Sequence, residues 1–365
     1  MRMKIIMALV LGAACAVRGD LAKIAALVLD AETREPLADV EMTAYFEIDN
    51  GWMAWKGSAT PNRVRVRTDR DGRCRAAEKT NAGHAWWIVN KVPAGYHLPS
   101  HGGGLDFERK NLLGVWQPTD VVCTVLVQRV GHQIPLVVRH VQKETGTPAS
   151  ADLIGKAGGK LAYDFLRCDW LPPVGQGETA DVVFTREAPE DTGSYVDPLG
   201  KRQRAYRQRV TMRFPGKDNG IVELKPPYYA VPLIRTAPED GYGPGLDFAY
   251  GRNTSGEEVK ENHLKKHFAF RIRARRDEQG RLVGGYYGKI YDGVEIACSR
   301  TEKEDVYEDL GDPRFAYYLN PAPLDRNLEW DVKRQLTWNP ATKRLEDVDR
   351  RDQDRLWTFR VQSRP

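Results

Sequence analysis

The chain has 365 residues, of which 41% are hydrophobic and 29% are charged. This composition is that of a globular protein and excludes a wholly disordered or fibrous chain. The length is too great for one ordinary domain, so we expect two folded units. The 55 basic residues are nearly balanced by 50 acidic ones, with a formal charge of +5, and we expect no nucleic-acid partner.

The N-terminus has the layout of a secretory signal peptide. Two basic residues precede an apolar run, Ile5–Ala14, and small residues follow. This order predicts a signal peptide over residues 1–16 and an extracytoplasmic protein that is secreted, periplasmic or held at the cell surface. Gly12–Cys15 also resembles a bacterial lipoprotein box, which would place a lipid on Cys15, and both outcomes stay open. The apolar run is roughly half as long as a bilayer span, so we expect no transmembrane segment.

Residues 21–130 are predicted to form short β-strands separated by polar turns. Ile24–Leu29 is the first strand, and a polar turn follows it. Asn62–Arg67 alternates arginine with valine, which gives one strand a basic face and an apolar face. Thr68–Gly72 then supplies a hairpin turn. A final strand is expected over Asp120–Val130, and this region is therefore predicted to be all β.

A set of positions in this region resembles the carboxypeptidase-regulatory family. The matching residues are Val28, Asp30, Thr33, Pro36, Leu37, Val40, Thr68, Asp69, Gly72, Gly95 and Tyr96. The resemblance implies a seven-stranded, transthyretin-like sandwich over residues 21–130. Such modules serve as accessory, stalk or binding domains in many exported proteins, so the resemblance implies a fold and no particular reaction.

Residues 134–365 are predicted to form a second, larger β-rich domain of unknown function. Two well-marked hairpins are expected, Gln208–Leu224 and Phe268–Tyr291, each with a glycine-containing turn. A sandwich or jelly-roll-like domain is the natural packing of such strands. This region carries no motif of a characterised family.

Four cysteines remain after the predicted signal peptide, and export would place them where disulfides form. They are Cys74, Cys123, Cys168 and Cys298. Since two fall in each predicted unit, we expect Cys74 to pair with Cys123 and Cys168 to pair with Cys298. The alternative of four buried free thiols stays open.

Sequence motifs for catalysis are absent. The chain has no G-x-S-x-G elbow, phosphate loop or dinucleotide fingerprint. His263 and His267 have the spacing of a helical metal-ligand pair, but lysines lie between them, and we expect neither a metal site nor a cofactor. Paired carboxylates could support glycoside hydrolysis; the candidates in apolar or aromatic surroundings are Asp164, Asp169, Glu223, Glu329 and Asp331.

The most distinctive pattern is arginine at alternate positions, because period-two spacing places each set on one sheet face. The three sets are Arg63, Arg65 and Arg67; Arg207, Arg209 and Arg213; and Arg271, Arg273 and Arg275. Guanidinium groups bind carboxylate and sulfate in bidentate fashion, which suits an anionic polysaccharide. The alternative is a solvent face whose arginines pair with acids across strands.

Aromatic residues offer a parallel indication, since exposed rings stack on sugars. The candidates are Trp52, Trp55, Trp86, Trp87, Tyr228, Tyr229, Tyr286 and Tyr287. We select Arg271, Arg273, Arg275, Trp86 and Tyr286 as the predicted ligand-binding residues.

We therefore predict an exported, non-catalytic protein for surface attachment or carbohydrate binding, with a polysaccharide or cell-envelope component as partner. One alternative is a carbohydrate-active hydrolase whose site lies in the second domain. The other is a structural envelope component that binds no small ligand.

Overall fold

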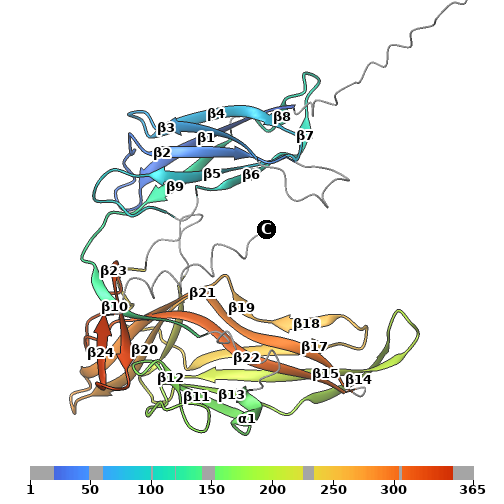
Figure 1. The fold of residues 1–365 in the computed structure, drawn as a ribbon, viewed down its shortest axis with the longest axis vertical. Helices are drawn as coiled ribbons and strands as arrows, with labels where there is room; N and C mark the ends of the chain where they lie inside the picture. The colour runs from blue at the N-terminus through green and yellow to red at the C-terminus, as the bar shows by residue number, and fades with distance from the viewer. Residues whose placement is uncertain are drawn as a thin grey trace, which may run out of the picture. The chain divides into compact units, whose positions relative to one another are not determined.

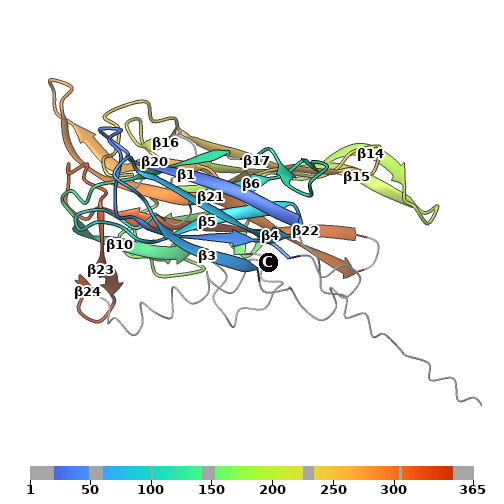
Figure 2. The ribbon, with the colours of Figure 1, turned by 90° about the horizontal axis from the view of Figure 1, so that it is seen from above.

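The computed structural model describes residues 20–48, 61–99, 102–119, 121–141, 153–224, 234–303 and 306–347. The regular secondary structure of these residues is almost entirely β-strand (Figures 1 and 2), which confirms the predicted mostly-β fold. They divide into two compact units between Val130 and Gly131. Their one helix, α1 (Leu153–Lys156), is a single turn, and no helix in this part of the chain is long and apolar enough to cross a membrane.

The first unit is a sandwich of two sheets. One sheet has the order β4-β1-β9, in which β1 runs antiparallel to β4 and parallel to β9. The other has the order β3-β2-β5-β6, and β7 and β8 form a separate small hairpin. The strand bounds are β1 (Asp20–Asp30), β2 (Glu41–Phe46), β3 (Asn62–Arg67), β4 (Arg73–Thr80), β5 (His84–Lys91), β6 (Gly104–Asp106), β7 (Arg109–Lys110), β8 (Trp116–Gln117) and β9 (Val122–Val127).

The two-residue periodicity of the strands builds the core of the first unit. Met42, Ala44 and Phe46 of β2 point inward and are fully buried, as are alternate residues of β1 and β5. Trp87 is the largest buried side chain of this core. Its neighbour Trp86 therefore lies on the opposite, outer face of the same sheet.

The two cysteines of the first unit do not form the predicted disulfide. Cys74 and Cys123 are free thiols, and both lie opposite Ala26, one on each side of the central strand β1. Two strand spacings put their Cα atoms about 10 Å apart, beyond the roughly 7 Å limit for a disulfide. Cys168 is also free, so its predicted bond to Cys298 is absent too; the side chain of Cys298 lies outside the described part.

A buried carboxylate closes one end of the first sandwich. Asp30 is fully buried and accepts hydrogen bonds from Tyr96 Oη (2.9 Å) and Arg129 Nε (2.6 Å) as well as from the amides of Glu32 and Thr33. Burial raises the pKa of Asp30, but these hydrogen bonds outweigh it and hold the pKa well below its usual range. Asp30 thus ties β1 to segments that lie far along the chain.

The second unit is a larger sandwich. One sheet has the order β16-β20-β21-β22-β10-β23-β24 with β19 paired to β21, and the other has the order β12-β11-β13-β15-β17-β18 with β14 paired to β15. The bounds are β10 (Ile134–Val141), β11 (Lys160–Asp164), β12 (Asp169–Trp170), β13 (Val182–Arg186), β14 (Glu190–Val196), β15 (Arg202–Arg213), β16 (Gly220–Leu224), β17 (Gly245–Arg252), β18 (Glu258–Glu261), β19 (His263–Leu264), β20 (His267–Arg276), β21 (Leu282–Lys303), β22 (Val306–Leu319), β23 (Trp330–Asn339) and β24 (Arg344–Asp347).

Aromatic packing holds the two sheets of this unit together. Phe165 stacks on Phe270 with ring centroids 4.6 Å apart and meets Tyr317 edge-on at 4.7 Å. The hydroxyl of Tyr317 donates a hydrogen bond to the carbonyl of Phe165 (2.8 Å). Edge-to-face and offset pairs of this kind add stability beyond area burial.

Candidate functional site

The outer face of the sheet β3-β2-β5-β6 brings two aromatic rings together. Tyr45 on β2 lies directly opposite Trp86 on β5. Their rings are nearly parallel, with an interplanar angle of 6° and centroids 5.4 Å apart. Both side chains are half-buried. An outward-facing, partly exposed aromatic pair is a surface on which a sugar ring can stack.

Polar groups border this pair on the β6 side. The ring of His84 stacks against Trp86 at 5.5 Å, and His84 Nδ1 lies 2.6 Å from Asp106 Oδ1. Gly104 lies opposite Trp86 on β6 and adds no side chain to that row of the sheet. A Cβ atom at Gly104 would meet its neighbours at ordinary van der Waals distances of 3.5 Å and more, so space is not the reason for glycine here.

Arginines border the pair on the β3 side. Arg63 lies opposite Tyr45, and Arg65 lies opposite Thr43; both guanidinium side chains are exposed. Arg67 differs, because it pairs with Asp39 at 2.5 Å and with Glu41 at 3.4 Å. The row Arg63, Tyr45, Trp86 therefore combines a cation with two stacked rings across three neighbouring strands.

The second arginine set largely follows the alternative of cross-strand pairing. Arg207 bonds to Glu261 at 2.8 Å, and Arg213 pairs with Asp247. Asp247 lies on β17 and Glu261 lies on β18, which belong to the same sheet as β15. Arg209 lies between them and is exposed. This face is therefore a solvent-exposed surface, and ion pairs of this type contribute little stability.

The third set, Arg271, Arg273 and Arg275, does not line one face. The pairing of β20 with β21 shifts register between Ile272 and Arg275, and Arg273 has a left-handed backbone with φ of 52°. Such a bulge rotates the following side chains away from simple alternation. Arg271 is only 6% exposed and donates to the carbonyls of Asp218 (2.7 Å) and Glu239 (3.0 Å).

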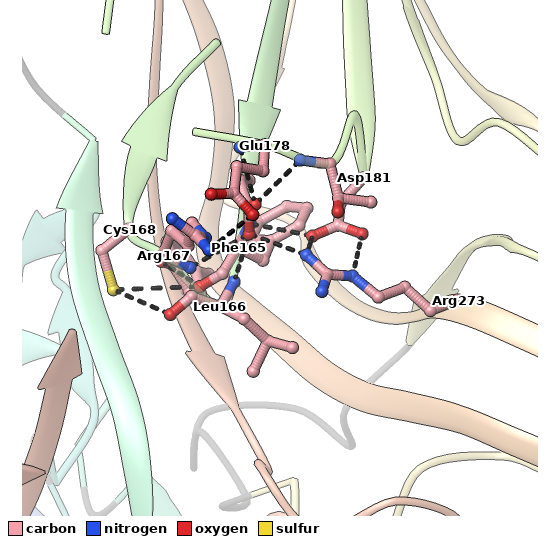
Figure 3. A network of polar contacts seen from close by, with 10 residues as sticks. Phe165, Leu166, Arg167, Cys168, Glu178, Asp181 and Arg273 are labelled. Carbon is pink, nitrogen blue, oxygen red and sulfur yellow. Dashed lines mark hydrogen bonds and ion pairs between the residues drawn. The ribbon is translucent and has the colours of Figure 1, made fainter. Parts of the chain in front are cut away.

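Arg273 belongs to a different, buried network (Figure 3). Its guanidinium bridges Asp164 at 2.7 Å and Asp181 at 2.8 Å, and these carboxylates are 1% and 2% exposed. Asp164 also accepts four backbone amides, those of Leu166, Arg167, Glu178 and Thr179. Burial raises the pKa of Asp181, and the bonds from Arg273 oppose that rise. The network thus holds the loop between β11 and β13 against β20. Of the third arginine set, only Arg275 is exposed.

The other hydrolase candidates are also engaged in structural contacts. Asp169 accepts the amides of Trp170 and Gln176, and Glu223 pairs with Lys266 at 2.8 Å. Asp331 accepts the amide of Lys333. Asp164 lies directly opposite Asp169 in the pairing of β11 with β12, but Asp164 is only 1% exposed and is bound by Arg273. Glu329 is also buried, at 3% exposed, and accepts the amide of Gly131.

Sequence reasoning missed an unusual lysine in the second unit. Lys289 is 1% exposed, and its Nζ donates to the carbonyls of Ile234 (3.0 Å) and Leu328 (2.5 Å) between the rings of Tyr291 and Tyr318. Burial lowers the pKa of Lys289 to about 7. A lysine inside an apolar strand is the sequence signal for such a site, since lysine is rarely buried without partners.

The remaining candidates lie elsewhere. Tyr286 is half-buried and packs against the core of the second unit, and Tyr287 is buried, so neither belongs to the face that carries Trp86. His263 and His267 do not belong to a metal-ligand cluster within the described ranges. The signal peptide, Cys15, Trp52, Trp55, Tyr228 and Tyr229 fall outside the described residues.

Comparison with known proteins adds structural likenesses of low similarity. No protein-family model matches the chain, and no curated protein matches its sequence. The minor pilin GBS52 of Streptococcus agalactiae is 17% identical with a TM-score of 0.23; the match covers 32% of this chain and 48% of that one, so the chain spans about half of GBS52. The major pilin SpaD of Corynebacterium diphtheriae is 11% identical, with 86% and 84% of the two chains covered and a TM-score of 0.23. The major pilin subunit BcpA of Bacillus cereus is 10% identical, with 87% and 98% covered and a TM-score of 0.22. Likeness this low does not assign a function.

Proposed function

We propose that the protein is an exported, non-catalytic binding protein that attaches to an anionic glycan through its first unit. The site is the outer face of the sheet β3-β2-β5-β6, centred on Trp86 and Tyr45 and bordered by Arg63 and Arg65. The first unit acts as a transthyretin-like binding module of the carboxypeptidase-regulatory type, and the partner is a cell-envelope or surface polysaccharide.

The observation that carries the proposal is the row Arg63, Tyr45, Trp86, in which cross-strand register sets an exposed cation beside two stacked rings. Sugar rings stack on aromatic faces through their C–H groups, and a uronate or sulfate group on the same sugar chain would pair with a guanidinium. Arg65, in the next row of the same face, would meet the next charge along a polymer.

The test is the affinity of the full chain for uronate and sulfated oligosaccharides at low salt. We expect Trp86→Ala to weaken binding by about tenfold, because one aromatic stacking contact is worth roughly 1 kcal/mol or more. The double variant Arg63→Gln/Arg65→Gln should weaken binding to a similar degree and reduce its salt dependence.

The matched control is Arg73→Gln/Arg75→Gln. Both residues are exposed and lie on β4, which belongs to the other sheet, so their loss removes equal charge from a different face. An equal loss of affinity in this control would refute the site, and no retention of the parent protein at low salt would refute the function. The mass of the exported protein separately distinguishes signal-peptide cleavage from lipidation at Cys15.

A further inference from the structure

A two-residue apolar tip projects from the hairpin of β7 and β8. Leu112 is 107% exposed and Leu113 is 86% exposed, so neither packs on the described protein. The turn itself is well built. The side chain of Asn111 accepts the amides of Leu113 (3.0 Å) and Val115 (2.9 Å), and Gly114 takes the left-handed conformation that the turn needs, with φ of 70°. The structure thus holds two leucines outward in a defined position.

The β7–β8 hairpin that carries the tip lies beside the beginning of β1 (Figure 1). Val115 bridges to Leu21 near the start of β1, and Trp116 Nε1 donates to the carbonyl of Thr80 at the end of β4 (3.1 Å). Leu21 is itself 37% exposed and pairs with Lys79. Three exposed leucines from β1 and the β7–β8 turn therefore lie at one end of the first unit.

Basic residues lie on the same strands and hairpin as these leucines. We name the surface the leucine end; it consists of Leu21, Lys23, Lys79, Arg109, Lys110, Leu112 and Leu113. Its lysines and arginine are all exposed, and Lys110 Nζ lies 4.4 Å from the ring centroid of Trp116. Three acidic residues, Asp20, Glu78 and Glu108, lie on the same segments, so the four basic residues exceed the acids by one.

We propose that the leucine end docks on a lipid bilayer that carries anionic headgroups. Leucines on a rigid turn enter the boundary between headgroups and acyl chains, while basic residues behind them contact lipid phosphates. Charge complementarity favours this occupant over an apolar protein groove, because lipid phosphates would pair with the basic side chains.

The second unit offers a matched control turn. Leu199 is 93% exposed, and Asp197 caps its turn as Asn111 caps the other one, accepting the amides of Leu199 (3.0 Å) and Lys201 (2.9 Å). Gly200 also has a left-handed φ, of 80°. The variant Leu199→Ser therefore replaces an exposed leucine in the same turn geometry, outside the leucine end.

The experiment measures partition of the full chain onto vesicles of phosphatidylcholine, with and without phosphatidylglycerol. Residues 1–19 are common to all variants, so differences between variants report on the folded surface. We expect Leu112→Ser/Leu113→Ser to weaken partition by about tenfold or more on anionic vesicles, and Leu199→Ser to leave it unchanged. Lys23→Gln/Lys79→Gln should weaken partition by roughly tenfold on anionic vesicles only.

Three outcomes would overturn the proposal. One is equal partition of the parent and the Leu112→Ser/Leu113→Ser variant. A second is an equal loss in Leu199→Ser. The third is unchanged partition together with lost self-association of the Leu112→Ser/Leu113→Ser variant in sedimentation, which would assign the leucine end to a second copy of the chain. Glycan affinity is measured separately on Trp86, so failure here leaves the proposed function standing.

Discussion

Replacement of Arg273 by methionine tests the buried network of the second unit. The change removes the guanidinium that bridges Asp164 and Asp181 at 2.7 and 2.8 Å and leaves two carboxylates that are 1% and 2% exposed. Removal of one partner from a buried ion pair costs about 3–5 kcal/mol, because the remaining charge stays desolvated. We expect the free energy of unfolding to fall by about this amount, a large part of the 5–15 kcal/mol typical of a domain.

Urea denaturation followed by circular dichroism measures this loss. The matched control is Arg275→Met, two residues along β20 and exposed, which should change stability by less than about 0.5 kcal/mol. Burial already raises the pKa of Asp181, and loss of Arg273 raises it further. Protonation of Asp181 at low pH then removes the uncompensated charge. The difference in the free energy of unfolding between Arg273→Met and the parent should therefore become smaller from pH 7 to pH 5. A difference in unfolding free energy below about 1 kcal/mol at pH 7, or a difference that does not change with pH, would refute this prediction.

Three further predictions concern buried groups. Asp30→Asn should destabilise the first unit by about 2–3 kcal/mol at pH 7. Because the pKa of Asp30 is well below its usual range in the folded state, the difference in unfolding free energy from the parent should begin to shrink below the unfolded pKa of about 4 and should be lost only near the much lower folded pKa; a constant difference down to pH 3 would contradict this. The pKa of Lys289 is lowered to about 7 in the folded protein, so above pH 7 the unfolded chain binds more protons than the folded one. The free energy of unfolding of the parent should therefore rise between pH 7 and 8.5, by up to about 1.4 kcal/mol per pH unit more than that of Lys289→Met. Parallel pH profiles of the two proteins would show that Lys289 stays charged. Cys74 and Cys123 should both be alkylated in the unfolded, unreduced protein, as the intact mass would show, and protection of either would contradict their separation across β1.

The alternation of the strands was the part of the fold most open to sequence reasoning. Arg63, Arg65 and Arg67 lie on one exposed face because β3 is a regular strand, and period two is then sufficient. The same reasoning failed at Arg271 and Arg273, because a change of register within β20 separates them. The local sequence of β20 does not predict a bulge that depends on its pairing with β21.

The candidate site could be predicted only in part for a similar reason. Trp86 is recognisable from sequence, since Trp87 beside it must take the opposite face. Its partner Tyr45 lies in a different strand, and their stacking depends on the register between β2 and β5. The disulfide prediction failed because counting cysteines per unit ignores that a central strand lies between Cys74 and Cys123.

Affinity for a uronate oligosaccharide and for its carboxyl-reduced form, measured with the parent and with Trp86→Ala, tests the proposed function most directly. The account predicts that the parent binds the charged form about tenfold or more tightly than the reduced form at low salt, since two guanidinium groups lose their partners on reduction. It also predicts that Trp86→Ala weakens both forms by a similar factor, because stacking does not depend on charge. Equal affinity of the parent for both forms, or no effect of Trp86→Ala on either, would contradict it.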